Sequence, residues 1–302
     1  MSPILLHTQK YAYLAKKILA LGGVEAGEIY VEYFPDGERY QRIITPIEDR
    51  EVVLLGGTIS DIDTLEFYDL ACAIEKQGAS SLTMVIPYYG YSTMERATKQ
   101  GEVVTGKTRA RLLSSIPNTG KGNRLILLDL HTEGLTHYFE GNIRPMHLYA
   151  KELVIEACKA LGGDDFTLAC TDAGRAKWVE SLANDMGVEA AFVFKRRLSG
   201  ENTAITGINA DVNNKTVIIY DDMIRTGGSL IKAAQAYKEA GAKTVFAVTT
   251  HGLFSNNALQ KIKDSGLFQA IVATDSHYNT SIIEDTFLQI KSVAGLIHQK
   301  IK

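Results

Sequence analysis

Short apolar runs alternate with amphipathic segments along most of the chain. The runs are rich in β-branched residues and too short for helices, so they predict buried strands. Strands are expected at residues 28–33, 51–57, 82–87, 124–129, 167–171, 189–194, 216–221, 244–250 and 269–274. Helical spacing of apolar residues predicts helices at 64–77, 148–161, 174–186, 229–240 and 285–301. Strands that alternate with helices predict parallel sheets with helices on both faces.

The two halves of this pattern are alike, because each contains strand–helix units and a polar loop that follows a strand. We therefore predict an α/β protein with two doubly wound parallel-sheet domains, related by an internal duplication. The first domain is expected at residues 1–148 and the second at 149–284, with 285–302 packing back on the first. In open sheets of this kind, ligands bind beyond the carboxyl ends of the strands.

Composition narrows the class of protein. The 302 residues, with 45% hydrophobic and 22% charged, suffice for two ordinary globular domains. A net charge of −3 and a pI near 6.2 argue against a general nucleic-acid binder, which needs a basic face. Three scattered cysteines, no signal-peptide pattern and no apolar run approaching about 18 residues lead us to expect a cytoplasmic protein without a membrane partner.

The most informative stretch is Val217 to Leu230, VIIYDDMIRTGGSL. A buried strand is followed by Asp221 and Asp222, and then by a glycine turn that leads into a helix. Glycines let backbone N–H groups turn inward, and the first amides of a helix attract phosphate. Two carboxylates beside such a loop suit the vicinal hydroxyls of a ribose, directly or through Mg²⁺. The alternative is a helix cap followed by an ordinary turn.

Two loops in the first half carry candidate chemistry. Pro35-Asp36-Gly37 has the residues of a tight turn between strands. Asp129 and His131 close a strand, where a histidine can bind a metal or a nucleotide, although a lone histidine is more often structural.

Two loops in the second half follow strands in the same way. Arg175 and Lys177 lie in the first turn of a predicted helix, where cations are unfavourable unless an anion binds, so this turn is a candidate pyrophosphate site. Residues 195–197 are three cations in a row, which by themselves favour a solvated surface.

The 217–230 stretch resembles the phosphoribosyl-pyrophosphate loop of the type I phosphoribosyltransferase fold. More narrowly, the chain resembles the ribose-phosphate pyrophosphokinase family along essentially its whole length. The resemblance is carried by Phe34-x-Asp36-Gly37-Glu38, Gly101–Lys107, Asp129-Leu130-His131, Asp172, Lys195-Arg196-Arg197, the 217–230 loop and His251.

The resemblance implies transfer of diphosphate from Mg²⁺-ATP to the anomeric hydroxyl of ribose 5-phosphate. It also implies a homodimer or hexamer, because the family's ATP site spans two subunits. It assigns catalysis to Lys195, Arg197 and His131; ATP binding to Phe34, Asp36, Gly37, Glu38, Arg96 and His131; and metal binding to Asp129, His131 and Asp172. The ribose-phosphate site would comprise Asp221, Asp222, Arg225, Thr226, Gly227, Gly228 and Ser229.

Four of the departures from the family's pattern leave the identity of the acceptor open. Arg225 replaces an aspartate of the loop, Arg175 replaces a glycine, and Thr93 and Met94 replace an arginine and a glutamine that hold ATP. These departures leave two alternatives: a pyrophosphokinase for a larger 5-substituted ribose such as ADP-ribose, and a catalytically silent regulatory homologue. A phosphoribosyltransferase would need neither Phe34–Glu38 nor a duplicated first domain.

Overall fold

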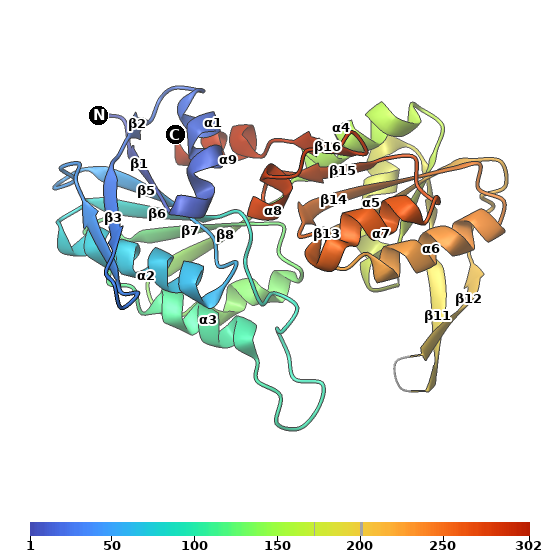
Figure 1. The fold of residues 1–302 in the computed structure, drawn as a ribbon, viewed down its shortest axis with the longest axis horizontal. Coiled ribbons are helices and arrows are strands. Elements are labelled where there is room, and N and C mark those ends of the chain that lie inside the picture. Colours follow the sequence, from blue (N-terminus) through green and yellow to red (C-terminus); the bar gives the residue numbers. More distant parts are fainter. Residues whose placement is uncertain (172, 200–201) are drawn as a thin grey trace. The chain divides into compact units, whose positions relative to one another are not determined.

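The computed structural model describes residues 1–171, 173–199 and 202–302, and the side chains of 173, 194–199 and 202–206 lie outside that description. Two compact units make up the chain: Met1–Tyr149 together with Val293–Lys302, and Ala150–Ser292 (Figure 1). Each unit contains one six-stranded sheet, and all pairs within the two sheets are parallel.

The sheet of the first unit has the order β2-β1-β5-β6-β7-β8. Its strands are β1 (Ile4–His7), β2 (Glu25–Ala26), β5 (Glu51–Leu55), β6 (Ser81–Ile86), β7 (Asn123–Leu128) and β8 (Ile143–Leu148). Its helices are α1 (Ala12–Leu19), α2 (Asp61–Lys76), α3 (Thr105–Ser114) and α9 (Ala294–Ile301), with short 3₁₀ turns at Gln9–Tyr11 and Glu133–Tyr138. Helices α1 and α9 lie across the sheet from α2 and α3 (Figure 1).

The sheet of the second unit has the order β10-β9-β13-β14-β15-β16. Its strands are β9 (Thr167–Cys170), β10 (Glu189–Ala191), β13 (Thr216–Ile224), β14 (Thr244–Gly252), β15 (Ile271–Thr274) and β16 (Leu288–Lys291). Its helices are α4 (Lys151–Gly162), α5 (Ala176–Met186), α6 (Gly228–Glu239), α7 (Ala258–Asp264) and α8 (Tyr278–Ser281), with 3₁₀ turns at Ala173–Arg175 and Ser255–Asn257.

The two sheets share one strand order. In each, the second strand of the chain forms an edge, the first lies beside it, and the remaining four follow in sequence. Each unit also inserts an antiparallel hairpin between its second and third sheet strands: β3 (Ile29–Tyr33) with β4 (Arg39–Ile43), and β11 (Val193–Ser199) with β12 (Asn202–Ile208). The predicted pair of duplicated, doubly wound α/β domains is confirmed.

Strand β13 shows why its continuous apolar run was informative. Val217 and Ile219 pack with residues of α6 and α7, whereas Ile218 and Tyr220 pack with residues of α4 and α5. Because successive strand residues point to opposite faces, a strand covered on both sides must be apolar at every position. This central strand carries the acidic pair at its carboxyl end.

Three predicted elements differ from the structure. The 28–33 run is half of an antiparallel hairpin with mostly exposed residues, because it lies outside the parallel sheet. The 189–194 run is divided between β10 and β11. Residues 285–301 are not one helix, since Leu288–Lys291 pairs with β15 as a strand and stays with the second unit; only Val293–Lys302 joins the first.

Candidate active site

The predicted phosphate cradle forms at the carboxyl end of β13. Gly227 adopts the left-handed conformation (φ 79°) as the N-cap of α6, so the chain turns sharply from strand to helix. A cavity of about 130 Å³ is lined by Asp221 and Met223–Leu230. Arg225, Thr226, Gly228 and Ser229 are exposed here. The exposed first turn of α6 therefore offers amides and hydroxyls to an anion.

The acidic pair lies beside this cradle and has partners from the β9–α5 segment. Asp222 is 2% exposed and forms an ion pair with Arg175, with Nη2 and Oδ2 2.5 Å apart. Thr171 Oγ1 donates to Asp221 Oδ2 at 3.0 Å. The register of the strands explains both contacts. Tyr220 of β13 pairs with Cys170, the last residue of β9, so Asp221 and Asp222 lie beside the segment that follows β9. The structure thus brings Asp221, Asp222 and Arg175 together.

Burial and the neighbouring Asp222 together raise the pKa of Asp221 to about 8, while Thr171 and Arg175 oppose the shift. The folded chain therefore keeps this proton to a higher pH than the unfolded chain, whose aspartates titrate near pH 4. The stabilising contribution is complete below about pH 4 and is lost as pH rises through about 8.

We expect Asp221→Asn to flatten the fall of thermal stability between pH 5 and 8.5, because asparagine cannot lose a proton. Melting midpoints of wild type and variant across this range would measure the effect. The contributions of other titrating groups to the pH dependence cancel in the difference between the melting midpoints of the two proteins. Parallel pH profiles would contradict the raised pKa.

In the first unit, Asp129 and His131 lie at the carboxyl end of β7. Asp129 is 5% exposed, has a positive φ of 37°, and donates its N–H to Leu148 O at 2.9 Å. His131 is half-buried. The turn therefore holds a carboxylate and an imidazole close together in sequence after a sheet strand, as predicted, while their roles stay untested.

His147 was missed as a site residue. Its Nε2 accepts the Leu130 N–H at 2.9 Å, which places the imidazole directly against the turn between Asp129 and His131. Its ring lies 4.1 Å from that of Tyr149. The sequence did not predict this position because Pro145 argues against a strand at 143–148. Strand β8 is an edge strand, where proline is tolerated.

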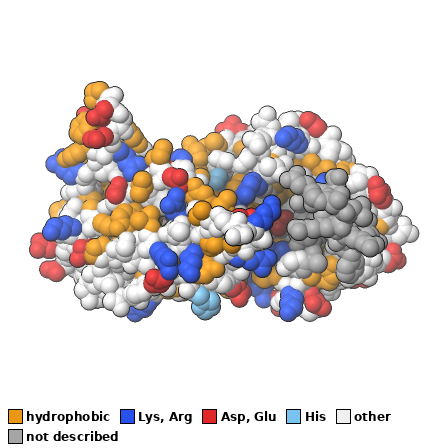
Figure 2. Space-filling model, turned by 90° about the horizontal axis from the view of Figure 1, so that it is seen from below, with side chains coloured by type: hydrophobic (Ala, Val, Ile, Leu, Met, Phe, Trp, Pro, Cys, Tyr) orange, Lys and Arg blue, Asp and Glu red, His pale blue; other side chains and the backbone are white. Residues whose placement is uncertain are grey.

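The Phe34–Glu38 segment is the tight turn that Pro-Asp-Gly predicts. Phe34 N–H donates to Glu38 O at 2.8 Å, and Asp36 Oδ1 accepts the Glu38 N–H at 3.0 Å. Gly37 supplies the positive φ of 94°. Phe34 itself is 44% exposed at the tip of the β3–β4 hairpin. Figure 2 shows exposed hydrophobic side chains between charged groups of both signs on one face of the molecule.

The loop after β6 carries Thr93 and Met94, two of the four departures named above. The side chain of Arg96 is 77% exposed, with Nε 3.4 Å from Glu95 Oε1, and Met94 is 44% exposed. The loop is held to α3 by the bond from Gly106 N to Met94 O at 3.1 Å. Arg96 is thus available to an anion.

For three predicted residues the structure describes no side chain. Asp172 is not described, and for Lys195 and Arg197 only the backbone is, in β11, which pairs antiparallel with β12. Their predicted roles remain predictions. His251 is 2% exposed, and its Nδ1 is 2.8 Å from Ser276 Oγ, which indicates a role in packing β14.

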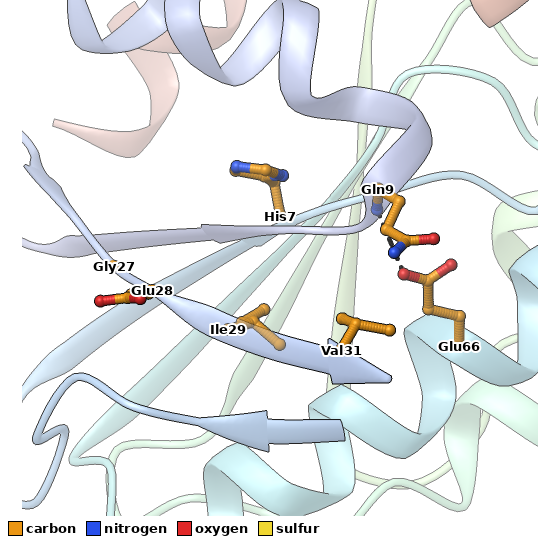
Figure 3. Close-up of a pocket in the computed structure, with 7 residues that line it drawn as sticks. All are labelled: His7, Gln9, Gly27, Glu28, Ile29, Val31 and Glu66. Carbon is orange, nitrogen blue, oxygen red and sulfur yellow. Dashed lines mark hydrogen bonds between the residues drawn. The ribbon is translucent and has the colours of Figure 1, made fainter. Parts of the chain in front are cut away.

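A larger cavity, of about 380 Å³, lies elsewhere in the first unit and includes none of the predicted residues. His7, Gln9 and Glu66 line it, together with residues 27–29 and 31 (Figure 3). Glu66 is 4% exposed, accepts the Gln9 N–H at 3.1 Å and lies 3.7 Å from Arg39 Nη1. Burial raises the pKa of Glu66, and its two partners join α2 to the 3₁₀ turn after β1 and to β4.

Among the described residues, no group of three or more His, Cys, Asp or Glu side chains could hold a metal ion. In the same part of the chain, no helix is long and apolar enough to cross a membrane.

Comparison with known proteins follows the division into two units. A family model described as the N-terminal domain of ribose phosphate pyrophosphokinase matches residues 4–116, and one described as a phosphoribosyl synthetase-associated domain matches 172–299. The fold is that of a phosphoribosylpyrophosphate synthetase from Mycobacterium smegmatis, with a TM-score of 0.87 and 24% identity over 100% of this chain and 98% of that chain.

Curated relatives define the family. A ribose-phosphate pyrophosphokinase of Fusobacterium nucleatum is 32% identical, covering 87% of this chain and 82% of that protein. Ribose-phosphate pyrophosphokinase 2 of Enterococcus faecalis is 33% identical, covering 96% and 88%. The chain belongs to the ribose-phosphate pyrophosphokinase family.

Proposed function

We propose that this chain transfers a diphosphate group from Mg²⁺-ATP to the anomeric hydroxyl of ribose 5-phosphate, releasing AMP and phosphoribosyl pyrophosphate. The observation that carries this proposal is the cradle at the end of β13, in which two carboxylates adjoin an exposed helix N-terminus. Family membership supplies the reaction class, and the cradle supplies a site of the right chemistry for a sugar phosphate.

The acceptor's 5-phosphate binds at Thr226–Ser229, where helix amides and two hydroxyls converge on one cavity. Asp221 lines the same cavity and accepts hydrogen bonds from the ribose hydroxyls. Arg225 lines the cavity as well and adds a positive charge beside the phosphate.

The nucleotide binds to the first unit. Phe34 stacks on adenine, Asp36 and Glu38 accept hydrogen bonds from the base around Gly37, and Arg96 and His131 contact the phosphates. The exposure of the Phe34–Glu38 turn suits a role in reaching another molecule of the chain, and we propose a homodimer or hexamer in the cytoplasm.

Mg²⁺ enters with ATP. Proteins usually hold Mg²⁺ through one or two carboxylates together with substrate phosphates and water, rather than in a complete protein cage. Asp129 at the end of β7 can supply one such carboxylate next to His131, and Asp172 is the second candidate. An ion held there would supply neutralisation of phosphate charge, while Lys195 and Arg197 stabilise the charge that spreads over the transferred group.

The alternatives from the sequence have weaker support. A larger acceptor such as ADP-ribose rests on Arg225, whose Nη2 lies 3.9 Å from Met223 Sδ. A silent regulatory role rests on Thr93 and Met94. The curated relatives favour neither alternative.

The test is AMP formation from Mg²⁺-ATP with ribose 5-phosphate and ADP-ribose offered separately, with phosphorus NMR of the products. We expect AMP and a new anomeric diphosphate with ribose 5-phosphate. Turnover with ADP-ribose alone would show that ADP-ribose is the acceptor. Absence of AMP with both acceptors would support the regulatory role.

Lys195→Ala is the control for that assay. Because Lys195 is the proposed cation at the reaction centre, the variant should lose AMP formation while still binding ribose 5-phosphate. AMP release at the wild-type rate in Lys195→Ala would mean that the signal comes from another ATP-consuming reaction.

A further inference from the structure

Arg175 makes a contact that its local structure disfavours. It is the last residue of a 3₁₀ turn and the N-cap of α5, where the helix dipole repels a cation. Its side chain is nevertheless only 18% exposed, and its guanidinium meets Asp222, whose side chain is 3% exposed. The ion pair therefore outweighs the unfavourable position.

A carboxylate as buried as Asp222 requires a compensating positive charge. Beside a sugar-binding loop, that charge can come from a divalent cation or from the chain itself. Arginine stays protonated at every accessible pH and binds a carboxylate through a planar fork of donors, so it provides a permanent counter-charge. In this chain the residue that approaches Asp222 is an arginine, where the family's pattern has a glycine with no side chain.

We propose that Arg175 occupies the position of a divalent cation at the ribose-binding carboxylates, so that the chain binds ribose 5-phosphate without Mg²⁺. The inference rests on the proposed function and specifies how its acceptor site works. Mg²⁺ is then needed for ATP and not for the sugar phosphate.

Two further observations support this division. Asp221 lines the cradle cavity whereas Asp222 does not, so one carboxylate contacts the sugar and the other holds Arg175. Thr171 Oγ1 donates to Asp221 Oδ2 at 3.0 Å, so a group of the chain itself satisfies part of the hydrogen-bonding capacity of this carboxylate.

The test is calorimetric titration of ribose 5-phosphate into the full chain without ATP, once with EDTA and once with Mg²⁺. Wild type should bind equally well in both buffers. Arg175→Gly should bind at least about tenfold more weakly in EDTA, because a hydrogen-bonded charge is lost, and Mg²⁺ should restore part of the affinity.

Lys159→Ala is the matched control, since it removes an exposed cation from α4 of the same unit and should behave as wild type. If Arg175→Gly does not fold, Arg175→Lys keeps the charge without the fork and should bind more weakly than wild type, still without Mg²⁺.

The possible failures are distinct. Wild-type binding that requires Mg²⁺, or an Arg175→Gly protein with wild-type affinity in EDTA, would overturn the role of Arg175 and leave the proposed function standing. Absence of ribose 5-phosphate binding in both buffers would overturn the acceptor assignment itself, and the inference with it.

Discussion

Replacing Gly227 with valine is expected to weaken ribose 5-phosphate binding by about 10² to 10³-fold. Gly227 has φ +79°, and a Cβ there would lie 2.9 Å from Cδ1 and Cγ1 of Ile262 in α7. A left-handed conformation costs a side-chain-bearing residue roughly 1–2 kcal/mol, and overpacking a core adds about 1–3 kcal/mol. The loop relieves both by abandoning the conformation that forms the cradle.

The control is Gly266→Val. Gly266 follows α7 and has a positive φ of +64°, and no atom lies within 4 Å of the position that a Cβ would take there. It therefore carries the backbone strain without the clash, and sugar phosphate affinity should stay at the wild-type level. Calorimetric titration of all three proteins measures the difference. Wild-type affinity in Gly227→Val would show that the cradle does not depend on this turn.

Gly90→Ala is expected to lower the unfolding free energy of the first unit by about 3 kcal/mol or more, since no side-chain adjustment relieves a backbone clash. A Cβ at Gly90 would lie 1.9 Å from the backbone oxygen of Thr58. The Gly90 N–H also donates to Thr58 Oγ1 at 2.7 Å, so the two loops are fixed against each other. The thermal midpoint should fall by about 6–12 °C.

Gly101→Ala separates crowding from backbone strain in the same loop. Gly101 has φ +85°, and no atom lies within 4 Å of the position that a Cβ would take. The substitution should lower the free energy of unfolding by about 1 kcal/mol, from backbone strain alone. Differential scanning calorimetry of both variants provides the comparison. Equal midpoints for the two variants would show that the approach of Gly90 to Thr58 contributes little.

The pattern along the sequence predicted the parts of the fold in which local chemistry and tertiary environment agree. The 216–221 run is apolar at successive positions because both faces of β13 are covered, and the glycine turn after it has the conformation that its residues favour. Strand β8 was missed because Pro145 is a local signal against strands that its edge position overrides. Residues 285–301 have helical spacing, yet Leu288–Lys291 is held in the sheet by pairing with β15.

The candidate site was predicted as separate loops, and its cross-strand contacts were not. Arg175 was recognised as a cation at a helix start that needs an anion, but the anion was expected to be a ligand. The structure shows that it is Asp222, and this contact depends on the register of β9 against β13, which no local signal encodes. The same holds for His147, which reaches the Asp129 turn only because β8 pairs with β7.

The shared strand order bears on the stoichiometry of ligand binding. Strand β5 and helix α2 correspond in position to β13 and α6, and the loop between them also has two glycines, Gly56 and Gly57. In that loop, however, Ser60 caps α2 and donates to Asp63 Oδ2 at 2.6 Å, and Lys10 meets the same oxygen at 2.8 Å. The carboxylate of Asp63 thus lies near the start of α2, at the position that corresponds to the proposed phosphate site at the start of α6. Each chain should therefore bind a single equivalent of sugar phosphate, although its architecture provides two comparable positions.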